Sequence, residues 1–556
     1  MNQWNRIISL LVVAIICAGE AWSARISQED AALVANNFMN VVSQHDGARR
    51  APAKRMVLKA SAPAESQYFI YENADGEGWV IVAANDAVTP ILAYSETGRF
   101  RTDNMPSNIR KWMSKYDTFI RKIEADGVEA SEEATAEWNA LRNGTHRAQA
   151  ATVVVGPLVK TTWDQDEPYN NLCPGEGVFG EGTTKAATGC VATAMAQLLN
   201  YWQWPIKGTG SHSYQPMDPN DTYSPSPHYT TQSANFGNTT YDWAHMKNSY
   251  WGSYTETQAN AVATLMYHCG VSTEMMYGSY DEYGSGALTV NYGNWNDHGY
   301  AQNAFPVFWG YKKEGLTSYI RDGFTWYGYK YYDAWTDADW TAMIKGELDK
   351  KHPIMYGGAG QDGGHSFICD GYDSNNKFHF NWGWSGSNDG YFTLSNLKPG
   401  SGGAGGGSYD FSEEQEVIIG IVPKNKPITI SWSVKGVVST TEIMLENPLV
   451  LPAEPEACNG KVFAGWTMQS EVSGEAPADL FKKATGKTVF DPVTYYAVFA
   501  TSTEGVLSDY CLDCIPTGVE EISQEPIAKS QKLIKDGRMY ILHGEAMYNI
   551  LGTRVQ

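Results

Sequence analysis

A cysteine at the start of an expected helix is the strongest candidate for a nucleophile in this sequence. Cys190 stands in the run AATGCVATAMAQLLNYWQWP, whose apolar residues recur at helical spacing until Pro205. Thr188 and Gly189 suit a helix start, where unpaired N–H groups and the helix dipole stabilise a thiolate and lower the thiol pKa. Position alone leaves an alternative, because a free cysteine is often a small buried core residue.

A histidine that could serve as the base lies in a second run, GAGQDGGHSFICDGYD. Gly363 and Gly364 leave the ring of His365 approachable, and the alternation from His365 to Cys369 predicts a strand with one packed face. The ring can therefore face a cleft and take the proton of a thiol.

An asparagine is expected to return to this histidine on a second strand. Residues 373–376, Asp-Ser-Asn-Asn, predict a turn that folds the chain back into KFHFNWGW, so that Asn381 comes close to His365. A carboxamide there accepts the imidazole N–H and orients the ring, and Trp382 shields that bond from water. A core hairpin whose aromatic side chains simply pack is the alternative.

An acyl-transfer site also needs hydrogen-bond donors at the oxyanion, each contributing about 3 kcal/mol. The backbone N–H of Cys190 is one donor, and Gln165 in the run TTWDQDEPYN has a side-chain amide that can supply a second. By its own chemistry, a loop glutamine is more often a solvated polar residue.

These runs together resemble the streptopain family of cysteine peptidases, secreted bacterial enzymes with a papain-like fold. The matching segments are DQDEPYN, AATGCVATAMAQLLNYW, PIMYGGAGQDGGHSFICDGYD, FHFNWGWSGSNDGYF and GSGGAGGG, which span nearly all of residues 155–424. The resemblance implies four catalytic residues: Cys190 as nucleophile, His365 as general base and then acid, Asn381 as the orienting residue, and Gln165 as oxyanion donor.

The substrate cleft is expected to be lined by Trp382, Gly358, Ala359 and Gly364. The resemblance implies extended peptides with an apolar residue second before the cut. It also favours a flap over the cleft at the glycine-rich residues 400–407, where a simple linker is the alternative.

The length of 556 residues predicts several domains, and the first segment, residues 1–23, has the pattern of a secretory signal peptide. Residues 24–150 predict a small α+β unit with helices near 31–42, 109–123 and 133–141. This unit resembles the family's propeptide, which implies a zymogen inhibited by its own prosegment. Conversion is expected between about residues 143 and 151.

The remaining segments are residues 151–424, the expected peptidase domain, and two C-terminal parts. Short strands at 428–432, 462–466 and 495–499 predict a β-rich module over 425–503, which resembles an internalin-B-type β-grasp repeat. Residues 504–556 form a linker and a tail with a hairpin pattern. The tail resembles sorting signals of type IX secretion, and a hairpin that closes the preceding module is the alternative.

The formal net charge of −21, most of it within residues 151–424, disfavours nucleic acid and anionic membranes as partners. Eight cysteines include Cys17 in the expected signal peptide, so an odd number remains and at least one thiol is expected to be free or paired between molecules. We assign Cys190 as that thiol. No metal-binding motif is present, and we expect neither a metal nor another cofactor.

The sequence therefore predicts an α+β protein: a papain-like two-subdomain cysteine peptidase with an N-terminal prodomain and a small C-terminal β-rich module. We expect a secreted or cell-surface endopeptidase, made as a zymogen, whose partners are peptide substrates, its own propeptide and, through its tail, the secretion machinery. Two alternatives stay open: a transglutaminase-like or amidase-like acyl transferase, and a non-catalytic surface adhesin in which Cys190 is structural.

Overall fold

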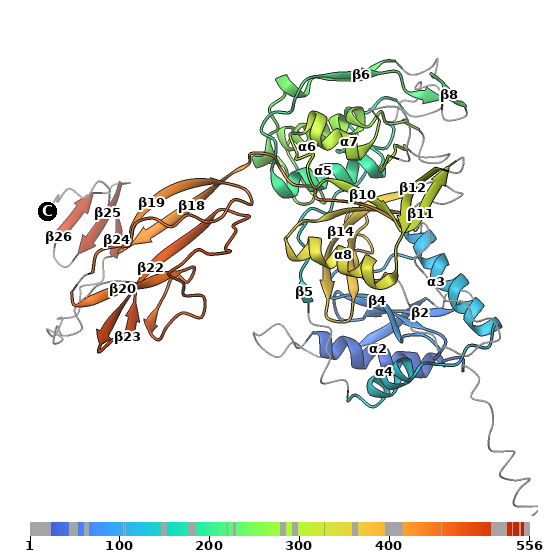
Figure 1. Ribbon diagram of the computed structural model, residues 1–556, viewed down its shortest axis with the longest axis horizontal. Coiled ribbons are helices and arrows are strands. Elements are labelled where there is room, and N and C mark those ends of the chain that lie inside the picture. The colour runs from blue at the N-terminus through green and yellow to red at the C-terminus, as the bar shows by residue number, and fades with distance from the viewer. Residues whose placement is uncertain are drawn as a thin grey trace, which may run out of the picture. The chain divides into compact units, whose positions relative to one another are not determined.

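A computed structural model of the protein divides into two compact units, Met1–Lys426 and Pro427–Gln556 (Figure 1). Residues 1–23, Ala359, Gly364 and residues 400–407 lie outside the described part of the chain. None of the described helices combines the length and apolar composition that crossing a membrane requires. The structure describes residues 24–43, 54–60, 66–103, 105, 107–145, 153–175, 185–218, 221–225, 230–278, 285–291, 299–326, 329–358, 365–394, 415–457, 459–512, 531–535, 538–543 and 546–549.

One antiparallel sheet of eleven strands runs through the first unit. Four strands come from the N-terminal module: β1 (Met56–Ala60), β2 (Tyr68–Asn73), β3 (Trp79–Ala83) and β4 (Ile91–Ser95). The others come from the expected peptidase: β16 (Gly390–Thr393), β15 (Lys377–Asn381), β14 (His365–Asp373), β13 (Ile354–Gly358), β17 (Gln415–Ile419) and β10 (Thr317–Ile320) in this order, with β5 (Val153–Val155) beside β14.

The described strands of the N-terminal module form no separate sheet. Strand β4 pairs with β16, with Tyr94 opposite Tyr391 and Ala93 opposite Phe392. The rings of Tyr94 and Tyr391 stack at 5.2 Å between centroids, and side chains of both modules share one hydrophobic core. The expected small α+β unit is thus built into the peptidase sheet.

Three helices complete the N-terminal module, and all three match the predicted helical patterns: α2 (Gln28–Val42), α3 (Ser107–Ala125) and α4 (Glu132–Arg142). Ser27 and Ser131 cap α2 and α4 by accepting backbone N–H groups of the first turn. Helix α3 buries Ile109, Trp112 and Tyr116, whose spacing places them on one face towards the sheet.

The peptidase part adds helices α5 (Cys190–Trp202), α6 (Glu256–Ser272), α7 (Ala301–Phe308) and α8 (Asp337–Asp349). Helices α5, α6 and α7 gather into one layer, while α8 lies with the sheet (Figure 1). Helix α5 packs against both α6 and β14, so it lies at the junction of the helical and sheet layers.

Three short strand pairs and two short helices accompany these elements: β6 (His212–Tyr214) with β9 (Gln232–Ala234), β7 (Met217–Asp218) with β8 (Asp221–Pro225), β11 (Asp322–Trp326) with β12 (Tyr329–Ala334), and η1 (Phe236–Asn238) and η2 (Trp243–His245).

The second unit contains a six-stranded sheet in which β18 and β22 run parallel. The three strands expected here are present, and Trp432, Trp466 and Tyr495 form an aromatic cluster on them. The predicted C-terminal hairpin is present as β25 and β26, with β24 as a third strand. The bounds are β18 (Pro427–Val434), β19 (Val437–Met444), β20 (Lys461–Thr467), β21 (Ser473–Gly474), β22 (Val493–Thr503), β23 (Val506–Cys511), β24 (Gln531–Lys535), β25 (Arg538–His543) and β26 (Ala546–Asn549).

Candidate active site

Cys190 is the first residue of helix α5, as predicted, and Gly189 is its N-cap. Gly189 adopts φ 88°, which favours glycine, and a Cβ atom there would lie 2.7 Å from Met275 Sδ and 3.0 Å from the Ser285 carbonyl. The expected threonine cap is absent, because Thr188 Oγ1 pairs instead with Thr193 Oγ1 at 2.9 Å. The positive φ and the lack of room for a Cβ atom both therefore require glycine at position 189, immediately before Cys190.

Cys190 is 8% exposed, and its thiol accepts the backbone N–H of Ser366 at 3.4 Å. Burial raises the pKa of the Cys190 thiol above its ordinary value, although N–H groups of Ser366, Val191 and Cys190 itself lower it. The sequence predicted a lowered pKa. In the full chain, removal of the thiol from water outweighs the donors at the helix start.

His365 is the first residue of β14, and its chain neighbour Ser366 is the residue that contacts the thiol. The predicted base is thus next in the chain to a residue that contacts the predicted nucleophile, although 175 positions separate His365 from Cys190 in the sequence. Gly358, at the end of β13, pairs with His365 across the sheet. The predicted cleft residue Gly358 is thus next to the histidine, whereas Ala359 and Gly364 belong to the part of the chain that is not described.

Asn381 ends β15, and the hairpin that carries it forms as predicted, with the turn between β14 and β15. Across the sheet Asn381 pairs with Ile368, which is three residues after His365 on β14. Asn381 Nδ2 donates to the Thr161 carbonyl at 2.7 Å, and Oδ1 accepts the Gly383 N–H at 3.1 Å. Among the hydrogen bonds of the described residues, none joins Asn381 to His365.

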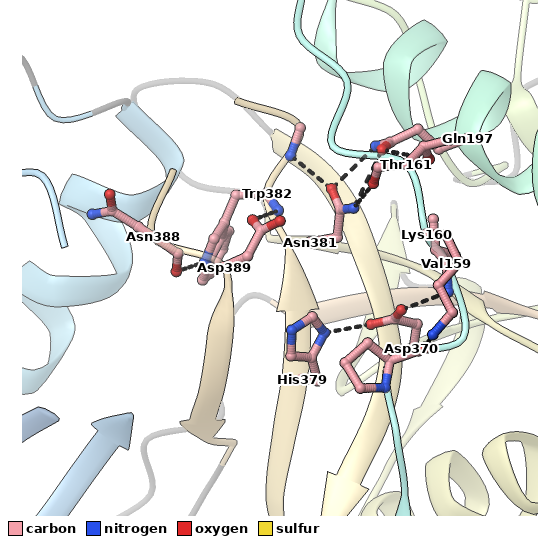
Figure 2. Close-up of polar contacts among 12 residues, drawn as sticks. Val159, Lys160, Thr161, Gln197, Asp370, His379, Asn381, Trp382, Asn388 and Asp389 are labelled. Atoms are coloured by element: carbon pink, nitrogen blue, oxygen red, sulfur yellow. Dashed lines mark hydrogen bonds and ion pairs between the residues drawn. The ribbon is translucent and has the colours of Figure 1, made fainter. Parts of the chain in front are cut away.

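Gln197, which the sequence interpretation overlooked, is the other partner of Asn381. Gln197 Nε2 donates to Asn381 Oδ1 at 3.1 Å, and Asn381 Nδ2 donates to Gln197 Oε1 at 3.2 Å. The two carboxamides face each other between β15 and α5 (Figure 2). A polar residue on the apolar face of a helix that begins at the nucleophile was the signal that could have identified it.

Gln165 is buried, and its backbone carbonyl accepts the Thr188 N–H at 3.0 Å. This bond holds the Gln165 segment against the loop that leads into Cys190. The predicted oxyanion donor therefore lies next to the loop that carries the other predicted donor, the Cys190 N–H.

Trp382 is almost fully buried, and its indole packs on Phe367 at 4.5 Å between ring centroids. Trp112 from helix α3 lies on the same cluster, 5.9 Å from Trp382 and 5.2 Å from Phe380. The sequence predicted that Trp382 lines the substrate cleft. In the full chain a tryptophan of the N-terminal module packs against it.

A partly buried cluster of titratable groups lies near Trp382 and was also overlooked (Figure 2). His379 Nδ1 is 2.6 Å from Asp370 Oδ1, and Asp389 Oδ1 accepts the Trp382 N–H at 2.9 Å. Burial alone lowers the pKa of His379, but the Asp370 carboxylate outweighs it and raises that pKa above its ordinary value. Burial raises the pKa of Asp389 to about 7, against the opposing effect of the Trp382 N–H. The backbone of the predicted cleft tryptophan is thus bonded to a group that titrates near neutral pH.

Cys190 is one of several free thiols, so the odd cysteine count does not single it out. Cys173, Cys269 and Cys369 are also free, and all three are fully buried. Burial raises the pKa of Cys173 to about 12 and the pKa values of Cys269 and Cys369 well above their ordinary range. What distinguishes Cys190 is its place at a helix start beside His365.

Comparison with known proteins gives two family matches. The model of the Peptidase C10 family matches residues 163–392, and the model of the Spi protease inhibitor family matches residues 23–120. The first match contains Cys190, His365, Asn381 and Gln165, and the second covers most of the module that contributes β1 to β4.

Curated relatives include streptopain from Streptococcus pyogenes, which is 31% identical over 373 residues, 64% of this chain and 81% of the relative. The thiol protease/hemagglutinin PrtT from Porphyromonas gingivalis is 29% identical over 424 residues, 75% of this chain but only 44% of the relative. The chain thus spans less than half the length of PrtT.

Solved structures that resemble the chain include a fragment of prointerpain A from Prevotella intermedia, with 32% identity and a TM-score of 0.49, which covers 67% of this chain and 100% of the fragment. Active interpain A from the same organism has 40% identity and a TM-score of 0.38, and covers 48% of this chain and 95% of that structure. The two family matches and the coverage of streptopain show that this α+β chain, with its papain-like fold, belongs to the Peptidase C10 family of cysteine proteases and carries an N-terminal protease-inhibitor domain.

Proposed function

We propose that the protein is a secreted cysteine endopeptidase, made as a zymogen and activated by its own cleavage. The observation that supports this most strongly is the contact between Cys190 Sγ and the Ser366 N–H at 3.4 Å, which brings His365 beside a thiol at a helix start. A thiol and an imidazole in this relation form the nucleophile and base of an acyl-transfer site.

In the proposed mechanism, Cys190 gives its proton to His365 and its sulfur attacks the peptide carbonyl. The oxyanion that forms is stabilised by the Cys190 N–H and the side-chain amide of Gln165. His365 then protonates the leaving amine, so that an acyl-enzyme remains on the sulfur. A water molecule, deprotonated by His365, hydrolyses this thioester and restores the thiol.

Asn381 orients His365 in this mechanism by accepting the imidazole N–H. In the full chain Asn381 Oδ1 already accepts from Gln197 Nε2 and the Gly383 N–H. A bond from His365 adds a third donor at this oxygen and therefore competes with the two that are present. This arrangement, together with the raised pKa of Cys190, supports a precursor that is latent before cleavage.

Residues 24–150 serve in this proposal as an intramolecular inhibitor. The support is the pairing of β4 with β16 and the contact of Trp112 with Trp382. The first contact consists of backbone hydrogen bonds between strands and the second of aromatic packing, so neither needs opposite charges. Cleavage between about residues 143 and 151 separates the inhibitor from the peptidase domain, which we place at residues 151–424.

Export and the C-terminal parts belong to the same proposal. Residues 1–23 direct secretion, residues 425–503 form a β-grasp-like module, and residues 504–556 carry a linker and a possible sorting tail. The parallel pairing of β18 with β22 and the separate strands β24 to β26 support a division into a module and a tail.

Peptide substrates are proposed to bind in extended form with an apolar residue second before the cut. A library of peptides incubated with the processed protein and sequenced at each cleavage site tests this. Cleavage without any such preference would contradict it.

Alkylation of the processed protein, followed by mass mapping, tests the peptidase itself. We expect rapid loss of peptide hydrolysis with a single modified residue, Cys190, and a new N-terminus near residue 151. Cys190→Ala should abolish hydrolysis and remain uncut in a protease-free preparation. An amine acceptor present during the reaction separates hydrolysis from acyl transfer, because only a transferase forms amide products with it.

A further inference from the structure

Gln197 lies on helix α5 about two turns after Cys190, on the same side of the helix. Its side chain has 0% exposure, in a helix whose other buried residues are mostly apolar. A carboxamide at such a place is costly unless all of its hydrogen-bonding groups are satisfied. The bonds of Gln197 therefore indicate why a polar side chain is present.

The bonds of Gln197 connect three segments of the candidate site. Gln197 Oε1 accepts from Thr161 Oγ1 at 2.9 Å and from the Trp163 N–H at 3.2 Å. The reciprocal bonds with Asn381, which we call the amide pair, join the same side chain to the end of β15. The helix of the nucleophile, the segment leading to Gln165 and the loop of Asn381 thus meet at one side chain (Figure 2).

Backbone partners fix the orientation of both carboxamides in the amide pair. The Trp163 N–H can only donate, so the Gln197 atom that faces it is the oxygen. The Thr161 carbonyl can only accept and the Gly383 N–H can only donate, so Asn381 directs Nδ2 to Thr161 and Oδ1 to Gly383. Turning either carboxamide over would place like groups against each other at several contacts.

We propose that Gln197 is a positioning residue, which acts on the reaction through Asn381 by holding its carboxamide with the oxygen available to His365. This proposal rests on the proposed peptidase function. When His365 donates to Asn381 Oδ1, the Gly383 N–H is the bond that yields, because Gln197 is held by three further hydrogen bonds. Asn381 then keeps its place while its oxygen changes one partner.

The substitution Gln197→Glu tests this role without a change of shape. A protonated glutamic acid can accept at one oxygen and donate from the other to Asn381 Oδ1, as Gln197 does. An ionised carboxylate loses that donor and places an oxygen against Asn381 Oδ1, which displaces the carboxamide. The carboxyl group, buried and facing an acceptor, should ionise above the ordinary range of glutamate.

The expected result is a new ionisation on the alkaline side of the activity profile. For Gln197→Glu, kcat/KM should approach the unchanged protein near pH 5 and fall about tenfold to a hundredfold below it by pH 8, with the loss in kcat and little change in KM. The rate of alkylation at Cys190 should show the same added ionisation. His379, which interacts with Asp370, Asp389 and Lys160, lies in the same part of the molecule (Figure 2), so the unchanged full-length protein is measured over the same pH range.

Two further variants separate positioning from general stability. Gln232→Glu makes the same substitution at a buried glutamine on β9, where Gln232 Nε2 donates to the Thr230 carbonyl and Oε1 accepts from Tyr267, and it should add no ionisation. Gln197→Met keeps the volume but has no polar groups, and it should lower kcat at every pH. Melting temperatures at each pH show which losses come from unfolding.

Three outcomes would overturn the proposal: no added ionisation in Gln197→Glu, a gain of activity as the glutamate ionises, or the same added ionisation in Gln232→Glu. If Gln197→Glu does not fold, an unchanged kcat in folded Gln197→Met overturns it as well. Failure of the peptidase function looks different, because the unchanged protein would then show no hydrolysis that depends on Cys190. The alkylation profile still decides the role of Gln197 in that case, since it needs no turnover.

Discussion

Asn388 pairs with the backbone of Arg101 through both ends of its carboxamide. The Arg101 N–H donates to Asn388 Oδ1 at 2.9 Å, and Asn388 Nδ2 donates to the Arg101 carbonyl at 3.1 Å. The backbone carbonyl of Asn388 also accepts the indole N–H of Trp382 at 3.1 Å. One residue of the peptidase part therefore holds both the N-terminal module and the tryptophan that follows Asn381.

Asn388→Asp should weaken the hold on the N-terminal module. The aspartate cannot donate to the Arg101 carbonyl, so this partly buried hydrogen bond is lost at a cost of about 0.5–1.5 kcal/mol. We expect residual hydrolysis by the uncut precursor and its processing rate to rise by up to about tenfold. A peptide hydrolysis assay measures the residual activity, and mass spectrometry over time measures the processing rate.

Asn376→Asp is the matched control for this substitution, because both residues have positive φ and Asn376 lies in the turn between β14 and β15. It should leave the processing rate unchanged. Equal rates for Asn388→Asp and the unchanged protein would show that the Arg101 contact does not contribute to latency.

Trp112→Ala should remove the main aromatic contact of helix α3 with the peptidase core. The Trp112 ring lies 5.2 Å from Phe380 and 6.3 Å from Phe367, and only 6% of the residue is exposed. Loss of a buried tryptophan costs about 3–5 kcal/mol. In a Cys190→Ala background, which blocks processing, urea unfolding should show a loss of this size.

The kinetic effect of Trp112→Ala separates inhibition from stability. Once the N-terminal module has been removed, the processed enzyme no longer contains residue 112. Its kcat and KM should then equal those of the unchanged enzyme, while the uncut variant should be more active than the uncut parent. Equal latency in both precursors would contradict this role for Trp112.

Gly189→Ala should disrupt the start of α5 and the reactivity of Cys190. The added methyl would meet Met275 Sδ at 2.7 Å and the Ser285 carbonyl at 3.0 Å, at a φ value that side chains other than hydrogen rarely adopt. Strain of this kind costs about 1–3 kcal/mol. We expect a lower melting temperature and slower alkylation of Cys190 in the protein that still folds.

Gly346→Ala is the control for Gly189→Ala, because an added methyl group should be tolerated at position 346. Gly346 lies within α8, and a Cβ atom there has no neighbour within 4 Å. Alanine in a helix interior is favoured over glycine by about 0.5–1 kcal/mol. A melting temperature that falls in Gly346→Ala would contradict the account given for Gly189.

Asp389→Asn should reduce the loss of stability as pH rises towards neutral. The pKa of Asp389 is raised to about 7 in the folded chain, so its contribution to stability is complete below the unfolded value near pH 4 and is lost as pH rises through about 7. One proton corresponds to about 1.4 kcal/mol per pH unit. Asparagine keeps the acceptor for the Trp382 N–H and does not titrate.

Urea unfolding measures how the free energy of unfolding changes with pH. We would unfold Cys190→Ala proteins at several pH values between about 4.5 and 7.5, the range in which Asp389 should affect stability. His379 changes stability in the same direction, because its pKa is also raised, and it is common to both proteins. Asp75→Asn, at an exposed carboxylate, is the control substitution. A slope that is equal in Asp389→Asn and its parent would contradict the prediction.

Local patterns were sufficient to predict the elements that carry the site. The apolar spacing after Cys190 identified α5, and the turn at residues 373–376 identified the hairpin of β14 and β15. These features depend on neighbours in the sequence, so their physical causes are visible there. The place of His365 beside Cys190 was inferred from motif order and stays a prediction, and the residue after it, Ser366, contacts the thiol.

The partners of Asn381 could not be predicted in the same way. A register shift between Cys369 and Gly371 decides that Asn381 faces Ile368, and such a shift arises from packing across the sheet. Gln197 meets Asn381 only because α5 lies on β14. The raised pKa of Cys190 depends on how much water is excluded, which no local pattern around the cysteine contains.

The pairing of β4 with β16 determines which edge of the sheet would be exposed after cleavage. While the N-terminal module is bound, the backbone of β16 at Tyr391 and Phe392 is paired on both sides, with β15 and with β4. If the N-terminal module leaves after cleavage, as proposed, β16 becomes an edge strand that carries the aromatic residues Tyr391 and Phe392 and unpaired backbone groups. Such an edge is a template for another strand, so we expect the mature peptidase to cover it with its own chain or with a second molecule.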